Sequence, residues 1–291
     1  ADNNTAVGKS ALVANTTGDR NVAVGSGAAD AGDVASRNSV LGYNALGADT
    51  KGSRNVAMGY GAIQTQNFTT ASDAYNVGIG YNAIGANTTG TLNTGIGGLA
   101  LNSNTTASNN TAVGYSALYA NTTGASNVAI GKSALTANTT GGSNVAIGKD
   151  AMAANTTANY NTAVGNTVMT ANTTGTQNTA VGYVALNANT TGSNNTALGV
   201  EALESNTTGG TNTAIGITAL QNNTTASNNT AVGYNSLNDN TTGAYNVAVG
   251  ALALDANTTA DNNVAVGYAS LGANTTGGAN TAVGTYALDA N

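Results

Sequence analysis

The chain has 291 residues, of which only 7% are charged, and its formal net charge at pH 7 is −6. It contains no Cys, His, Pro or Trp, which removes the histidine bases, thiol nucleophiles and zinc ligands of most familiar enzymes, so no catalytic, metal or cofactor site is expected. All seven basic residues precede position 150, so half of the chain has no cation to hold a phosphate and nucleic-acid binding is not expected. No apolar run approaches the ~20 residues that cross a bilayer, so this segment is not expected to insert into a membrane.

One repeat extends through residues 1–291. Its most regular feature is the pentapeptide N-(T/V)-A-(V/I)-G, whose glycine, called here the anchor glycine, occurs 17 times, beginning with Gly8. Fifteen of the sixteen intervals between anchor glycines are 17 residues, and the interval from Gly59 to Gly80 is 21 residues. We therefore expect a single continuous array, with a four-residue insertion within 60–75 and no second domain. The repeats are numbered as coils 1–17, and positions within a coil are given as offsets from the anchor glycine.

In chain order, each coil begins with Asn at position −4, which is present in all 17 coils. Stacked coils would place these amides one strand spacing apart, at ~4.8 Å. Such a column predicts either a ladder of amide hydrogen bonds or a turn former that tolerates a left-handed backbone, and the sequence leaves both interpretations open.

Positions −3 to −1 form a short β-branched and apolar run, for example residues 111–113, which the anchor glycine ends. The pattern indicates short strands separated by Gly and Asn turns, and one coil has room for two strands of about five residues. Position −1 is aliphatic in every coil, and position +4 is Leu, Ile or Met except at Ala29. We expect these two columns to form the apolar interior. Position −2, which is Ala or Gly except at Val40, should then face outward, where another sheet or chain approaches.

The one irregular segment is 64–75, which contains the only phenylalanine, Phe68. An extended loop with a single large aromatic side chain on an otherwise uniform array is a candidate contact site. Asn67, Phe68 and Tyr75 are therefore candidate contact residues. A tolerated insertion with no binding role is the alternative.

The segments 39–48 (SVLGYNALGA) and 127–137 (NVAIGKSALTA) resemble the SVAIG-containing repeats of trimeric autotransporter adhesin heads. The longer form NTAVGYxALxANTTG resembles repeats of phage tail-fibre shafts. The resemblance covers essentially the whole chain, and it implies a trimeric, left-handed parallel β-roll. The coils here are longer than the usual adhesin-head coil, and N-T-T-G fills the added turn.

Thirteen coils contain the sequence N-T-T, which matches the acceptor pattern for N-linked glycans in exported proteins. Either the array carries a regular row of glycans, or these are turns whose Asn and Thr side chains bond to the backbone. The candidate acceptors are Asn15, Asn87, Asn104, Asn121, Asn138, Asn155, Asn172, Asn189, Asn206, Asn223, Asn240, Asn257 and Asn274.

The threonines and the tyrosines suggest two further functions for the surface. Regular threonine arrays are typical of ice-binding solenoids, but the adjacent threonines of N-T-T should point to opposite sides. Tyr follows the anchor glycine in seven coils, and a row of exposed aromatic rings could contact sugars.

The sequence thus predicts an all-β parallel β-solenoid of 17 coils, of the left-handed β-roll type, that associates as a homotrimer. The predicted function is a non-enzymatic structural shaft of an extracellular fibre or adhesin, of the phage tail-fibre or bacterial surface type, which spaces or displays a receptor-binding element. The alternatives are a subunit of a glycosylated extracellular filament and a repetitive ice- or glycan-binding surface. A cell-surface glycan or receptor is the expected partner besides the chain itself, at a cell or virion surface.

Overall fold

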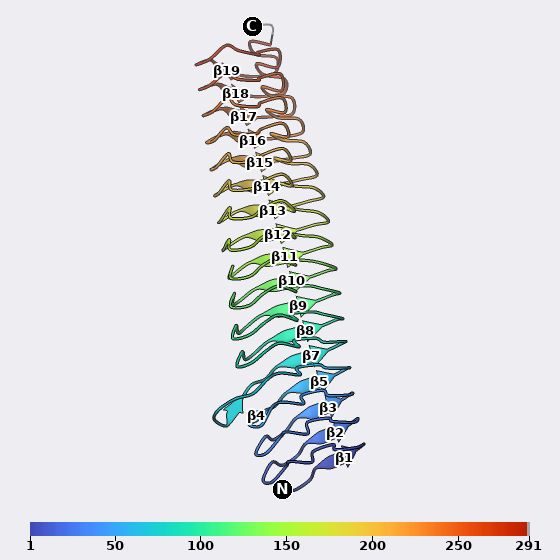
Figure 1. Ribbon diagram of the computed structural model, residues 1–291. Helices are drawn as coiled ribbons and strands as arrows, with labels where there is room; N and C mark the ends of the chain where they lie inside the picture. Colours follow the sequence, from blue (N-terminus) through green and yellow to red (C-terminus); the bar gives the residue numbers. More distant parts are fainter. Residues whose placement is uncertain (290–291) are drawn as a thin grey trace. The chain divides into compact units, whose positions relative to one another are not determined.

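The computed structural model describes residues 1–289, and within that range the chain forms strands and turns but no helix. It is a parallel β-solenoid with a 17-residue spacing, which confirms the predicted fold class. The chain divides into two compact units, residues 1–144 and residues 145–291, and the stacked coils of each are visible in Figure 1. No helix that could span a membrane is found in the described part of the chain.

Each coil contributes one strand, formed by positions −3 to −1, and identical positions pair in neighbouring coils, as Ala163 does with Ala180. The first unit contains β1 (Thr5–Val7), β2 (Val22–Val24), β3 (Ser39–Leu41), β5 (Val56–Met58), β7 (Val77–Ile79), β8 (Thr94–Ile96), β9 (Thr111–Val113) and β10 (Val128–Ile130). The second contains β11 (Val145–Ile147), β12 (Thr162–Val164), β13 (Thr179–Val181), β14 (Thr196–Leu198), β15 (Thr213–Ile215), β16 (Thr230–Val232), β17 (Val247–Val249), β18 (Val264–Val266) and β19 (Thr281–Val283). A separate parallel pair joins β4 (Gly52–Ser53) to β6 (Ser72–Asp73).

The expectation of two five-residue strands per coil is wrong, because the rest of each coil is a series of left-handed turns. Positions −5, +2 and +4 have positive φ in every coil, and at +4 the residue is a bulky one such as Leu118 (φ 53°). The N–H groups of these residues bond to the neighbouring coil, as in Leu118 N–H to the Ala134 carbonyl at 2.9 Å. Buried side chains and these bonds hold a conformation that bulky residues rarely adopt.

The anchor glycine is required for two reasons. Its φ lies between 128° and 145° in all coils, a region that side chains of L-residues avoid. A Cβ at Gly114 would also lie 2.6 Å from the carbonyl oxygen of Gly131 in the next coil. The glycine therefore permits both the turn after the strand and the close stacking of coils.

The interior was predicted only in part. Position +4 is buried in coils 2–16, as expected. Position −2 is also buried in coils 2–17, whereas position −1 points outward: in coil 8, Ala129 is fully buried and Ile130 is 38% exposed. The prediction that the aliphatic residues at −1 face inward is therefore wrong. The Leu column at +4 already fills the narrow coil, so only a small residue fits inside the strand.

The sizes of the interior residues are matched between neighbouring coils. A Cβ at Gly78 would lie 2.7 Å from Cγ1 of Ile63, and a Cβ at Gly95 would lie 2.7 Å from Cγ1 of Ile84. These are the only glycines at position −2 and the only isoleucines at position +4. Position −2 of one coil thus packs against position +4 of the coil before it, and an interior Ile requires a Gly opposite.

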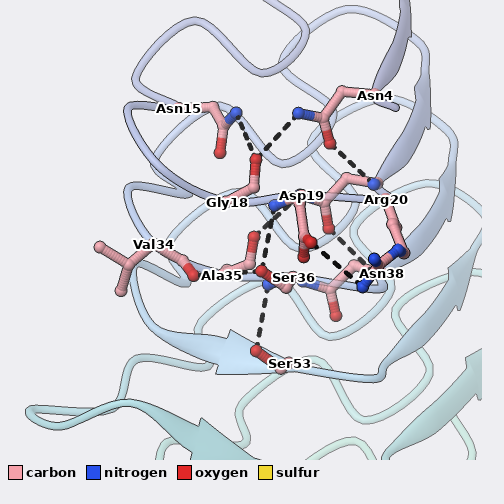
Figure 2. A network of polar contacts seen from close by, with 11 residues as sticks. Asn4, Asn15, Gly18, Asp19, Arg20, Val34, Ala35, Ser36, Asn38 and Ser53 are labelled. Carbon is pink, nitrogen blue, oxygen red and sulfur yellow. Dashed lines mark hydrogen bonds and ion pairs between the residues drawn. The ribbon is translucent and has the colours of Figure 1, made fainter. Parts of the chain in front are cut away.

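The Asn column at position −4 forms a ladder, which settles the alternatives left open by the sequence. Each Oδ1 accepts the backbone N–H of the next Asn in the column, for example Asn21 N–H to Asn4 Oδ1 at 2.8 Å. In most coils Nδ2 donates to the carbonyl at position +10 of the same coil, as Asn4 does to Gly18 at 2.9 Å (Figure 2). The amide therefore links the strand to the opposite side of its coil and to the next coil.

Candidate functional site

The most extended feature of the surface is a row of outward aliphatic side chains at position −1, which we call the apolar stripe. None of its members is buried; Leu41 is 51% exposed in the first unit and Leu198 is 47% exposed in the second. In the first unit the stripe consists of Val7, Val24, Leu41, Met58, Ile79, Ile96, Val113 and Ile130. In the second unit it consists of Ile147, Val164, Val181, Leu198, Ile215, Val232, Val249, Val266 and Val283.

Position −3, the other outward position of each strand, enlarges this surface. It is Thr or Val in every coil except at Ser39, and it is nowhere buried. Both positions therefore present methyl groups from a hydrogen-bonded parallel sheet whose backbone is already paired between coils. Rows of exposed apolar side chains are typical of interaction sites.

The N-T-T asparagines, at position +7, lie inside the coils. All except Asn15 are at most 1% exposed, and each Nδ2 donates to a backbone carbonyl three residues later, at 2.9–3.3 Å. Most also donate to Oδ1 of the Asn one coil earlier, as Asn189 does to Asn172 at 2.8 Å. A glycan on such a nitrogen would replace a buried N–H, so the folded coil offers no accessible acceptor there.

The bonds between successive N-T-T asparagines form a second amide ladder, at position +7, which is interrupted in coils 2–4. Position +7 is Gly32, Asp49 and Gln66 in these coils. Asp49 is 1% exposed and accepts Gln66 Nε2 at 2.7 Å and Gly52 N–H at 2.8 Å. Burial raises the pKa of the Asp49 carboxyl above its ordinary value, although these hydrogen bonds act in the opposite direction. A carboxylate has no N–H to donate, and Gly32 has no side chain to accept one.

The candidate contact loop is tied to the array rather than extended from it. Phe68 is 8% exposed and so contributes little to an exposed contact, whereas Asn67 and Tyr75 are exposed. The Arg54 guanidinium lies 5.2 Å from the centre of the Tyr75 ring and pairs with Asp73 at 3.2 Å. The structure thus places the Tyr75 ring next to Arg54, which pairs with Asp73, and buries Phe68.

The tyrosines after the anchor glycine are exposed, as the sugar-contact interpretation requires. Tyr43, Tyr60 and Tyr81 form a stack with ring centres 5.2 and 5.6 Å apart. In coils 2–4, a surface hollow of about 360 Å³ is lined by Asp30, Asn44, Gly47, Ala48, Gln64 and Thr65. This hollow could not be predicted from the sequence, because its residues meet only when coils stack.

Acidic side chains do not gather into a metal centre. Within residues 1–289 there is no group of three or more acidic side chains placed to hold a metal ion. Glu201 and Glu204, the only two glutamates, both accept Nε2 of Gln221, at 3.0 and 2.8 Å.

Comparison with known proteins finds no matching family model, no curated protein and no solved structure with significant similarity.

Proposed function

We propose that this chain is a non-enzymatic structural shaft of an extracellular fibre or adhesin, assembled from three copies through the apolar stripe. The observation that carries the proposal is the stripe itself. It recurs in every coil and, within residues 1–289, it is the only column of large aliphatic residues that the folded coil does not use for its own interior.

The stripe suits contact between sheets of identical chains. Burying its half-exposed Val, Ile and Leu side chains contributes favourable free energy at each coil, and the contribution accumulates along the array because every coil repeats it. Three copies, as the resemblance to adhesin heads implies, can turn this face of each sheet toward a common axis and leave the tyrosines and turns outside. A shaft of this kind spaces or displays a receptor-binding element at a cell or virion surface.

The stripe is tested by the mass of the assembly in solution. We expect light scattering after size exclusion to give three times the chain mass of 28.2 kDa. Ile130→Lys combined with Val164→Lys should give monomers with an unchanged β-type circular dichroism spectrum, because a charge at these positions cannot be buried between chains. Tyr115→Lys is the matched control, since the same position already holds Lys132 and Lys149 in other coils. A wild-type chain that stays monomeric at all concentrations contradicts the proposal.

A second candidate for the same face is ice binding, favoured by the outward threonines at position −3. They occur in five consecutive coils of the second unit, at Thr162, Thr179, Thr196, Thr213 and Thr230. The threonines that the sequence pointed to, those of N-T-T, are not the ones on this sheet. Thermal hysteresis by a monomeric chain would favour this candidate over the shaft.

The glycosylated filament is not favoured, because the acceptor nitrogens are buried and hydrogen-bonded. Peptide mapping by mass spectrometry of the chain secreted from a glycosylating host tests this directly: no glycan is expected on the buried N-T-T asparagines.

A further inference from the structure

The hollow in coils 2–4 exists because one side chain is missing. Position +5 is Asp30 in coil 2, Gly47 in coil 3 and Gln64 in coil 4. Gly47 leaves open the space between its two neighbours in this column, and Asp30 Oδ1 lies 3.5 Å from the place where a Cβ of residue 47 would be. The resulting volume of about 360 Å³ is at the small end of ligand sites, enough for one or two sugar rings.

The polar groups around the hollow are not used by the protein. Within residues 1–289, the Asp30 carboxylate and the side-chain amides of Asn44 and Gln64 make no hydrogen bond to another residue. Thr65 donates its hydroxyl to the carbonyls of Gly85 and Asn87, at 2.9 and 3.1 Å, and keeps its lone pairs for a ligand. The hollow is therefore surrounded by three polar side chains that make no hydrogen bond within the protein and by the Thr65 hydroxyl oxygen, which can still accept one.

In three other coils, position +5 is closed by an internal bond. Wherever Asn occupies position +5, its Nδ2 donates to the carbonyl at position +2 of the preceding coil. The distances are 2.9 Å for Asn102 to Asn82, 2.6 Å for Asn187 to Thr167, and 2.8 Å for Asn238 to Thr218. An Asn in this column therefore closes on the preceding coil, whereas the side chains around Gly47 leave the space open.

The chemistry of the lining favours a neutral, hydroxyl-rich ligand. A carboxylate accepts two hydrogen bonds side by side, and each amide donates and accepts, so together they match the adjacent hydroxyls of a sugar ring. None of the lining residues is cationic, so a sulfate, phosphate or carboxylate on the ligand would have no partner and would face Asp30.

An exposed aromatic ring is adjacent in sequence to one of these polar residues. Tyr43 directly precedes Asn44 and is 50% exposed. Tyr60 stacks on one face of its ring, while the same position in coil 2 is Ser26, and no other aromatic ring stacks on Tyr43 in the described part of the chain. The open face can pack against the C–H groups of a sugar, as aromatic rings do when they offer apolar area with a polar tip.

We propose that the first unit binds a neutral oligosaccharide in the hollow over Gly47, with Asp30, Asn44 and Gln64 bonding the sugar hydroxyls and Tyr43 stacking on the ring. This inference is separate from the proposed shaft, because the hollow lies on positions +2, +5 and +6 and not on the apolar stripe.

The test begins with an array of oligosaccharides that contains neutral hexose and N-acetylhexosamine probes together with sialylated and sulfated ones. We expect binding to neutral probes only. Titration calorimetry with the strongest neutral probe should then give a dissociation constant that rises at least about tenfold in Asp30→Ala, the effect of losing about 1.4 kcal/mol of hydrogen bonding.

The decisive variant is Gly47→Asn. Residue 47 has no positive φ, and Asn at this position is already part of the fold in other coils, where it closes on the preceding coil. Gly47→Asn should therefore fill the hollow, keep the melting temperature and abolish binding. Ala153→Asn makes the same change at position +5 in the second unit and should leave binding unchanged.

Three results would overturn the inference: no neutral probe bound by the wild-type chain, binding confined to acidic probes, or equal affinity in Gly47→Asn and wild type. The oligomeric mass of each variant, measured on the same preparation, separates a failure of this site from a failure of the shaft.

Discussion

Coils 10–14 in the second unit and coils 2–5 in the first have the same backbone conformation but differ in the residues that fill their interiors. In coils 10–14 every interior position has the same kind of residue: Ala at −2, Leu or Met at +4 and Asn at +7. Coils 2–5 depart from this at all three positions. Both regions nevertheless have a buried interior and nearly continuous hydrogen bonding between coils.

The departures in coils 2–5 occur in compensating pairs. Gly78 makes room for Ile63, and Val40 is the one large residue at −2, directly after the coil whose +4 residue is only Ala29. Gly32 has no side-chain oxygen to accept a hydrogen bond from the next coil, and the next residue in its column, Asp49, has no N–H that needs such an acceptor. Packing and hydrogen bonding must therefore be satisfied between successive coils. A single coil can depart from the regular pattern when its neighbour compensates.

The largest expected effect is in the regular region. Leu186→Ala should lower the free energy of unfolding by about 3 kcal/mol, because it deletes a fully buried side chain with no larger residue opposite to fill the space. Chemical denaturation followed by circular dichroism measures this. Tyr183→Ala, at an exposed position of the same coil, should change stability by less than about 0.5 kcal/mol. Equal losses in both variants would contradict the assignment of the interior.

The second effect tests the amide ladder. Asn189→Ala removes the donor to Asn172 Oδ1 and the acceptor of Asn206 Nδ2, and both of those groups are buried. We expect a loss of about 2 kcal/mol in the free energy of unfolding. Thr191→Ala in the following turn is exposed and should be close to neutral. A neutral Asn189→Ala would mean that the ladder contributes nothing to stability.

The third effect tests the pairing of coils directly. Gly78→Ala should cost about 1–2 kcal/mol, because the new Cβ would overlap Ile63. Combining it with Ile63→Leu recreates the Ala and Leu pair of the regular coils and should restore most of the loss. A double-mutant cycle measures the coupling energy, expected near 1 kcal/mol. Additive effects of the two substitutions would show that adjacent coils do not constrain each other in size.

The smallest effect concerns Asp49 and depends on pH. Its folded-state pKa lies above the ordinary 3.8, so the folded chain binds the proton more tightly than the unfolded chain does. The contribution of this group to stability is therefore greatest below pH 3.8 and is lost as the pH rises through the folded-state pKa. Asp49→Asn should stabilise the chain by about 1 kcal/mol at pH 7.

This gain should disappear below the ordinary pKa, because the wild-type carboxyl is then protonated in both states. Urea denaturation at pH 7 and at pH 3 measures the difference. A gain that is the same at both values would place its origin in something other than the buried charge.

Much of the architecture follows from the sequence alone. The period, the parallel stacking and the interior place of residues such as Leu118 come from spacing and residue type. The inward side of the strand does not, because alternation shows which residues share a face but not which face is inside. Ala112, not Val113, faces inward, since Leu118 and its equivalents already occupy the available volume.

The candidate sites were harder to predict for a related reason. Asn121 and its equivalents look like turn residues, and only the stacked coils reveal that their amides are buried and bonded to one another. The hollow over Gly47 depends on residues from three coils, and a glycine in a glycine-rich chain carries no signal by itself. Phe68 suggested a surface contact because it is unique, but burial of a lone aromatic side chain is the more favourable outcome.

The amide ladder at position +7 also gives the coils a polarity. Where the ladder is unbroken, Nδ2 points to Oδ1 of the preceding coil, as in Asn121 to Asn104 and Asn223 to Asn206, so the side-chain dipoles add in one direction and polarise one another. Any stack of such coils has one terminal face that offers amide oxygens and another that offers amide hydrogens. Two such faces of the same kind repel, and two of opposite kind continue the ladder. If such coils were joined end to end through this ladder, the joint would be head-to-tail, the arrangement that leads to open filaments instead of closed pairs.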